Sequence, residues 1–261
     1  MIKLRIYPPL LWISSLLLLL GCSGNSAQYS QNLIVIDAGH GGHDSGAIGA
    51  GRYEKDLVLT IAQKTAKAFR DKGYRVYLTR NTDRFIKLSG RTKIADRKDA
   101  TLFISIHANA IANKNRFEIV EGIETYFLQK TRDAKSQRIA VRENSAVLQG
   151  ADTLSKSVII DSVLNGPKIV ESNKLAIDVQ RHMMKSVQNE YADVKNGGVR
   201  PAPFYVLVGA SRPSILVEVG YMTHTKERNR LFVPAYQNRI AQGIVAGAST
   251  YIQNRKEEMG F

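Results

Sequence analysis

Two histidines and two glutamates occupy positions from which they could do chemistry together. His40 and His107 each follow a short apolar run of the kind that forms a buried strand. Glu54 precedes an amphipathic segment, and Glu218 lies inside the apolar run 215–219. Zinc catalysts commonly take three protein ligands from His, Glu and Asp and leave the fourth position to water, whose proton a separate carboxylate moves. These residue types therefore suit a zinc hydrolase.

Each of these residues also has an ordinary structural explanation. A histidine at a strand end is more often hydrogen-bonded than bound to a metal, and Glu54 alone is typical of an acid favoured by a helix dipole. Glu218 is harder to explain in this way, because a carboxylate flanked by so much apolar sequence is costly to bury without a partner. The catalytic interpretation therefore depends on whether the four residues share one cleft.

The pattern of apolar residues predicts strands that alternate with helices. The expected strands are residues 33–37, 74–79, 101–107, 122–128, 204–208 and 215–219, and the expected helices are 56–70, 88–97, 172–187 and 234–251. The alternation predicts an α/β fold with a single domain, a mixed, mostly parallel sheet of about six strands flanked by helices. In such sheets the active site lies off the carboxyl ends of the strands, where His40 and His107 both fall.

The same residues belong to a series of longer motifs. These are residues 35–47 (VIDAGHGGHDSGA), 54–56 (EKD), 78–80 (LTR), 105–110 (SIHANA), 202–207 (APFYVL) and 213–221 (PSILVEVGY). In this order they resemble the motifs of the zinc-dependent N-acetylmuramoyl-L-alanine amidases, which split peptidoglycan during cell separation. The resemblance runs from residue 33 to about residue 252, which is essentially the whole mature chain.

The resemblance implies one zinc ion per chain, with His40, Glu54 and His107 as its ligands and Glu218 as the catalytic glutamate. It also implies hydrolysis of the amide between the lactyl group of N-acetylmuramic acid and the L-alanine of the stem peptide, for cell-wall remodelling and daughter-cell separation. Two alternatives stay open. One is a zinc peptidase that cuts within the stem peptide, and the other is a lipoprotein that binds the wall without cutting it.

The other histidines and two nearby aspartates carry weaker predictions. His43 lies in a Gly-Gly turn that does not hold it on one face with the first histidine, so we expect either a loop residue or a residue that supports the metal ligands without binding the metal. Asp37 and Asp44 suit either the orientation of metal ligands or the capping of the turn. His182 lies in a predicted helix and is expected to be structural, whereas His224 departs from the family pattern, in which asparagine is usual.

The N-terminus predicts export. Lys3 and Arg5 precede an apolar run that ends at Leu20-Gly21-Cys22, an order typical of a secretory signal, and its end resembles the lipobox of bacterial lipoproteins. Cys22 is the single cysteine of the chain, which suits lipidation better than a disulfide. Leu20 departs from the usual small residue, so cleavage by the general signal peptidase, or an uncut anchor, is the alternative. We expect an exported protein of the periplasm or cell envelope, held on a membrane by a lipid anchor.

These features divide the chain into a signal peptide (1–22), a flexible tether (23–31), a catalytic domain (32–254) and a C-terminal tail (255–261). Within the domain, residues 130–170 are polar and charged and show no clear strand pattern. Some members of the resembled family carry an insertion at this place, whose glutamate reaches the zinc until a partner protein pulls the insertion away. Glu143 is the candidate autoinhibitory residue, and the implied partner is a protein activator that displaces residues 130–170. Ordinary surface helices are the alternative.

The chain is strongly basic, with a formal net charge of +14 from 37 Lys and Arg against 23 Asp and Glu. Such a charge favours anionic partners. Nucleic acid is an unfavourable choice, because the chain is expected to be exported and shows no recognition motif for DNA or RNA. Peptidoglycan is the expected partner, and a solvated basic surface without a specific polyanion site is the ordinary alternative.

Overall fold

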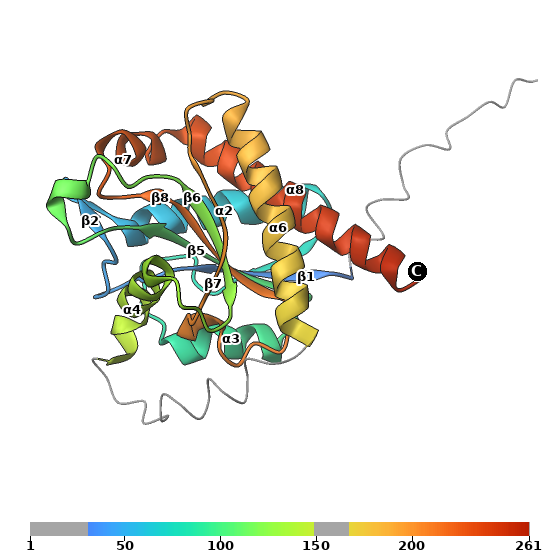
Figure 1. The fold of residues 1–261 in the computed structure, drawn as a ribbon. Helices are drawn as coiled ribbons and strands as arrows, with labels where there is room; N and C mark the ends of the chain where they lie inside the picture. Colours follow the sequence, from blue (N-terminus) through green and yellow to red (C-terminus); the bar gives the residue numbers. More distant parts are fainter. Residues whose placement is uncertain (1–30, 149–166, 261) are drawn as a thin grey trace, which may run out of the picture.

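The computed structural model describes residues 31–148 and 167–260, which form an α/β domain (Figure 1). The predicted signal peptide with Cys22, nearly all of the predicted tether and residues 149–166 of the predicted insertion lie outside the described residues. Within the two described ranges, no helix combines the length and the apolar character needed to cross a membrane.

A mixed sheet forms the centre of the domain, with strands in the order β4-β1-β5-β8-β6-β7. The strands are β1 (Leu33–Ala38), β4 (Arg75–Leu78), β5 (Leu102–Asn109), β6 (Ile123–Leu128), β7 (Asn196–Ala202) and β8 (Ser214–Tyr221). Strands β4, β1, β5 and β8 are parallel, whereas β6 is antiparallel to β8 and parallel to β7. The short strands β2 (Ile48–Gly49) and β3 (Arg52–Tyr53) form a separate hairpin. The predicted six-stranded, mostly parallel sheet is confirmed.

Helices flank the sheet (Figure 1). They are α2 (Glu54–Asp71), α3 (Leu88–Arg97), α4 (Ala134–Leu148), α6 (Pro167–Gln188), α7 (Thr225–Leu231) and α8 (Pro234–Glu258), with 3₁₀ turns η1 (Lys114–Arg116) and η2 (Tyr205–Leu207). Helix α2 packs on β1, β4 and β5, α6 packs on β6, β7 and β8, and α8 packs on both helices. Helix α8 continues to Glu258, into the region that the sequence assigned to the tail.

The order of the strands explains where a cleft opens. From β1 the chain crosses through α2 to β4 on one side, and then returns through α3 to β5 on the other side of β1. Because such crossovers are right-handed, α2 and α3 lie on opposite faces of the sheet. The carboxyl ends of β1 and β5 therefore form a switch point, the usual place for a site in this class of sheet.

In the main sheet, one predicted strand is wrong and one strand was not predicted; the short hairpin of β2 and β3 was not predicted either. The apolar run 204–208 forms the 3₁₀ turn η2, where Val206 and Leu207 are buried. The sixth strand is β7 instead, whose sequence NGGVRPA contains two glycines and a proline and so lacks the usual strand composition. Proline is tolerated there because β7 is the edge strand of the sheet.

Candidate metal centre and active site

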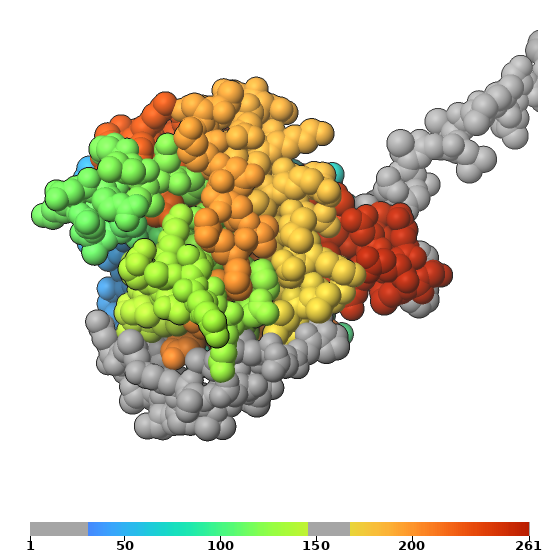
Figure 2. All heavy atoms as spheres, in the orientation of Figure 1, coloured from blue at the N-terminus to red at the C-terminus, as the bar shows by residue number. Residues whose placement is uncertain are grey.

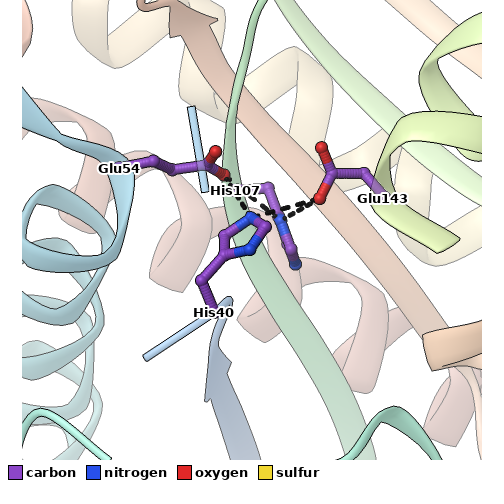
Figure 3. Close-up of side chains that lie close together, drawn as sticks. All are labelled: His40, Glu54, His107 and Glu143. Carbon is purple, nitrogen blue, oxygen red and sulfur yellow. Dashed lines mark ion pairs between the residues drawn. The ribbon is translucent and has the colours of Figure 1, made fainter. Parts of the chain in front are cut away.

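Four buried side chains from four separate segments converge at the carboxyl ends of β1 and β5 (Figure 3). His40 lies just past β1, and His107 lies near the end of β5. Glu54 is the first residue of α2, and Glu143 lies on α4. The structure thus brings the three predicted zinc ligands together with the predicted autoinhibitory glutamate.

The converging atoms are a nitrogen of each histidine and an oxygen of each glutamate. His40 Nε2 lies 3.0 Å from Glu54 Oε1 and 3.2 Å from Glu143 Oε2. His107 Nδ1 lies 3.3 Å from Glu54 Oε1 and 2.9 Å from Glu143 Oε2. For comparison, ligands on tetrahedral bonds of about 2.0–2.1 Å are roughly 3.3 Å apart. The four histidine–glutamate distances are therefore close to this spacing, and all four atoms lie within 4.8 Å of one another, close enough to bind one metal ion.

The chemistry of these atoms also fits a cation. His40 Nε2, His107 Nδ1 and Glu143 Oε2 are buried and have no hydrogen-bond partner among the described residues. Although burial opposes both shifts, His40 lowers the pKa of Glu54 to about 2, and Glu143 raises the pKa of His107 to about 9. Two buried carboxylates thus favour positive charge between them, and a divalent metal ion held by these four residues would supply it.

Neighbouring backbone and side-chain groups fix the orientation of the ligands. The backbone N–H groups of Ala108 and Ala47 donate to the two oxygens of Glu54, each at 2.8 Å. Asp44 Oδ2 lies 2.9 Å from His40 Nδ1, which leaves the other ring nitrogen of His40 for the cluster. Such contacts hold ligand rings and carboxylates in place and raise metal affinity. Asp44 Oδ1 also accepts from the backbone N–H of Gly46 at 3.1 Å, so Asp44 has both of its predicted roles, the orientation of a ligand and the capping of the turn.

Two glycines make this close packing possible. A Cβ atom on Gly39 would lie 2.4 Å from the ring of His107. A Cβ atom on Gly46 would lie 2.6 Å from both Glu54 Oε2 and the ring of His40, and Gly46 also has a positive φ of 64°. Side chains at either position would push the ligands apart, which explains the glycines inside this motif.

Two arginines to which the sequence assigned no role, one of them in the motif 78–80, hold the backbone of the His40 loop. Arg80 is fully buried and donates to the carbonyls of Ala38 and Gly39 at 2.9 and 2.7 Å. Arg91 donates to the carbonyls of Ala38 and His40, each at 2.7 Å. These bonds hold His40 at a φ of 58°, a conformation that non-glycine residues rarely adopt. The arginines therefore place the first ligand by fixing its backbone.

Arg80→Lys is expected to lower the zinc affinity about tenfold, because changes to groups that orient ligands typically have effects of this size or larger. The guanidinium reaches carbonyls in two separate segments, at Gly39 and Lys55. A single ammonium cannot copy this fork. Competition with a chromophoric chelator measures the affinity, and circular dichroism checks the fold. Arg75→Lys, at an exposed position of β4, is the matched control. An unchanged affinity in Arg80→Lys would contradict the positioning role.

Glu218 lies beside the four converging residues His40, Glu54, His107 and Glu143, which are called the metal cluster below. It pairs with His107 in the register of β5 and β8, so both side chains project from the same face of the sheet. Its side chain is fully buried, and neither carboxylate oxygen has a hydrogen-bond partner among the described residues. Burial and the Glu143 carboxylate raise the pKa of Glu218 well above its usual value. A carboxyl group in this condition is suited to accept and return a proton.

Helix α4 covers this arrangement and contributes charges of both signs. Its Glu143 reaches the two histidines (Figure 3), and the guanidinium of Arg142 forms an ion pair with Glu143 and lies 3.8 Å from Glu218 Oε1. Arg142 also donates to the carbonyl of Ala110 at 2.6 Å. On its other side α4 is open to solvent (Figure 2), where Val141 is 64% exposed. The helix therefore occupies the space in front of both the cluster and Glu218.

Comparison with known proteins places the chain in a family. The family model described as N-acetylmuramoyl-L-alanine amidase matches residues 34–250. The chain belongs to this amidase family. The amidase AmiA of Escherichia coli is 32% identical over 225 residues, which are 85% of this chain and 76% of AmiA.

Solved structures of amidases share the fold. The amidase AmiC2 of Nostoc punctiforme is 36% identical and superimposes with a TM-score of 0.65, covering 85% of this chain and 97% of AmiC2. An N-acetylmuramoyl-L-alanine amidase from Clostridium difficile 630 is 30% identical with a TM-score of 0.66, covering 86% of this chain and 98% of that one. The α/β fold predicted for this amidase is therefore that of its relatives.

The remaining predicted residues of the amidase lie outside the metal cluster. His43 packs against the ring of Phe85, with centroids 4.1 Å apart. His182 lies on α6, where its Nε2 is 3.2 Å from Thr250 Oγ1, as expected of a structural histidine. His224 caps α7, because its Nδ1 accepts from the backbone of Glu227 at 3.2 Å. This histidine thus makes the helix cap that asparagine commonly makes.

Asp37 anchors the site from below the metal cluster. Its carboxylate is fully buried and accepts hydrogen bonds from Thr79 Oγ1 at 2.6 Å, Ser105 Oγ at 2.7 Å and Arg91 Nη1 at 2.8 Å. Burial alone would raise its pKa, but Arg91 and the two hydroxyls lower it. Asp37 therefore stays charged and holds Arg91 under the His40 loop, an indirect form of the orienting role predicted for it.

Proposed function

We propose that this amidase uses one zinc ion to hydrolyse the amide between the lactyl group of N-acetylmuramic acid and L-alanine in peptidoglycan. The observation that carries the proposal is the quartet of His40, Glu54, His107 and Glu143 beside the buried Glu218, whose oxygens have no hydrogen-bond partner among the described residues. Family membership supports the substrate, since the relatives are named for this activity. Remodelling of the wall and separation of daughter cells would follow from such an activity.

Three residues would hold the zinc during catalysis, namely His40, Glu54 and His107, with Glu143 removed. Zinc in such a site supplies a Lewis acid for the scissile carbonyl and makes water more acidic. Glu218 would then take a proton from the attacking water and deliver it to the nitrogen of the leaving L-alanine. Burial of Glu218 supports this role, because a raised pKa matches a group that must hold the proton between the two steps.

Mass spectrometry of digested sacculi tests the proposal. Purified protein is expected to leave intact glycan strands and to release peptides that begin with free L-alanine. A zinc peptidase would instead release fragments cut within the stem peptide, and a wall-binding protein would release nothing. Treatment with a chelator is expected to abolish the release and added zinc to restore it, because removal of the metal would remove the Lewis acid that the reaction needs.

We further propose that α4 is an autoinhibitory element, as predicted for residues 130–170. Glu143 Oε2 lies within 3.2 Å of both histidine nitrogens and so takes the fourth position that water needs. Arg142 fills the space next to Glu218 at the same time. A protein activator that binds the exposed side of α4 and withdraws the helix would open the site, and the exposed Val141 offers apolar contact to such a partner.

We also propose that the protein is exported and carries a lipid on Cys22, which would hold it on a membrane of the cell envelope. The lipobox-like order of residues 19–22 and the single cysteine support this proposal. Labelled fatty acid is expected to be incorporated into the wild type and not into Cys22→Ser. Labelling of Cys22→Ser to the same extent would contradict it.

A further inference from the structure

A second buried carboxylate lies on the sheet next to Glu218 and has no role in the proposed hydrolysis. Glu124, on β6, is fully buried and pairs directly with Glu218 in the register of β6 and β8. Three donors hold its Oε2, namely the hydroxyls of Tyr126 at 2.8 Å and Tyr221 at 3.2 Å and the amide of Asn109 at 3.3 Å. One oxygen of Glu124 is thus fixed by the sheet itself.

The other oxygen of Glu124 faces a cation from α4. The ammonium of Lys135 forms an ion pair with Oε1, and Arg200 Nε lies 3.6 Å from the same oxygen. Lys135 belongs to the helix whose Glu143 and Arg142 cover the metal cluster and Glu218. Displacement of α4 would therefore remove this ammonium from Oε1 and leave Arg200, on β7, as the cation that remains near this buried carboxylate.

Three side chains of the site, the predicted metal ligand His107 and the carboxylates of Glu218 and Glu124, form a row across neighbouring strands. His107 on β5 pairs with Glu218 on β8, which pairs with Glu124 on β6. Because strands lie about 4.8 Å apart, the row spans roughly 10 Å. If the carbonyl of a bound amide lies at the cluster and its nitrogen at Glu218, the peptide continues toward β6. Glu124 is then on the leaving-group side of the site.

We propose that Glu124 is a subsite for a primary ammonium group of the stem peptide, which takes the place of Lys135 when α4 is withdrawn. This inference rests on the proposed amidase function and adds the recognition of the leaving peptide to it. An ammonium is the group that Lys135 already presents to Oε1. Burial and the Glu124 carboxylate raise the pKa of Tyr126 and Tyr221, so both hydroxyls stay protonated and continue to hold Oε2.

The test compares peptidoglycan with free amino groups and the same peptidoglycan after acetylation of those groups. The rate of hydrolysis of each substrate is measured from the appearance of new N-terminal alanine. The wild type is expected to cut the acetylated wall about tenfold more slowly, the effect of losing one charge-assisted hydrogen bond. Acetylation also makes the wall more anionic, and this change by itself would favour binding of a chain with a net charge of +14. The expected decrease in rate is therefore opposite to the effect of overall charge.

Glu124→Gln is expected to cut the two substrates at similar rates, because an amide retains the shape but not the charge. Glu190→Gln, an exposed carboxylate paired with Arg239, is the matched control and should discriminate as the wild type does. A wild type that does not discriminate, or a Glu124→Gln variant that discriminates like the wild type, would overturn the subsite. Failure of both the wild type and Glu143→Ala, which lacks the glutamate that covers the cluster, to release alanine from either wall would instead reject the proposed function.

Discussion

Glu218→Gln is expected to lower the rate of amide hydrolysis by about 10²- to 10⁴-fold, the usual contribution of a general acid–base group. Glutamine has nearly the same shape as glutamate, but it can neither accept the proton of water nor return it to the leaving nitrogen. Glu218 does not belong to the metal cluster and has no hydrogen-bond partner among the described residues, and Arg142, 3.8 Å from its Oε1, keeps its bonds to Glu143 and Ala110. The variant should therefore fold and keep its zinc.

Three measurements separate this expectation from a structural effect. The rate of release of N-terminal alanine gives the catalytic loss, metal analysis gives the zinc content, and thermal unfolding gives the stability. Because Glu218 is buried with a raised pKa, its neutral replacement is expected to leave the stability equal or higher. Full activity in Glu218→Gln with zinc bound would remove Glu218 from the mechanism, whereas loss of zinc would indicate a part in metal binding.

Glu143→Ala is expected to raise the basal activity of the purified protein about 10- to 100-fold. The estimate corresponds to the loss of one charged contact of about 1.5–3 kcal/mol that holds α4 on the site. The carboxylate of Glu143 lies 2.9 Å from His107 Nδ1 and within 3.2 Å of His40 Nε2. Removing it frees the fourth position of the cluster while the other three ligands remain.

The control for this prediction lies on the same helix. Val141→Ala changes an exposed side chain of α4 and is expected to leave the basal activity as it is. Zinc content distinguishes the two roles that Glu143 can have. An active variant with one zinc per chain supports autoinhibition, and an inactive variant without zinc would make Glu143 a permanent ligand. Basal activity equal to that of the wild type would reject the autoinhibitory role.

The sequence predicted most of the fold because buried parallel strands leave a clear pattern. Strands β1, β5 and β8 are completely buried, so their sequences are almost continuously apolar. The edge strand β7 lacks this pattern, since it is only half covered and contains Gly197, Gly198 and Pro201. The apolar run 204–208 satisfied the strand pattern but is buried as a 3₁₀ turn, because a short apolar run does not specify its own backbone conformation.

The sequence by itself determined the residues that gather at the cluster, because His40, Glu54 and His107 lie in motifs whose order and spacing are specific. It did not determine what surrounds them. The bonds from Arg80 and Arg91 to the backbone of the His40 loop join segments about 40 to 50 residues apart.

Only the tertiary structure decided which charges face each other. It places α4 over the cluster, pairs Lys135 with Glu124, and sets Glu124 beside Glu218 in the sheet. In the sequence Glu124 is one polar residue of an otherwise ordinary strand, and nothing local indicates its burial. The physical reason is that residue types and their local spacing specify which hydrogen-bond donors and acceptors exist. Contacts between strands and helices that are distant in sequence decide which of these groups remain without a partner. The groups without a hydrogen-bond partner, and those such as Glu124 whose partner lies on α4, are the ones left to bind metal and substrate.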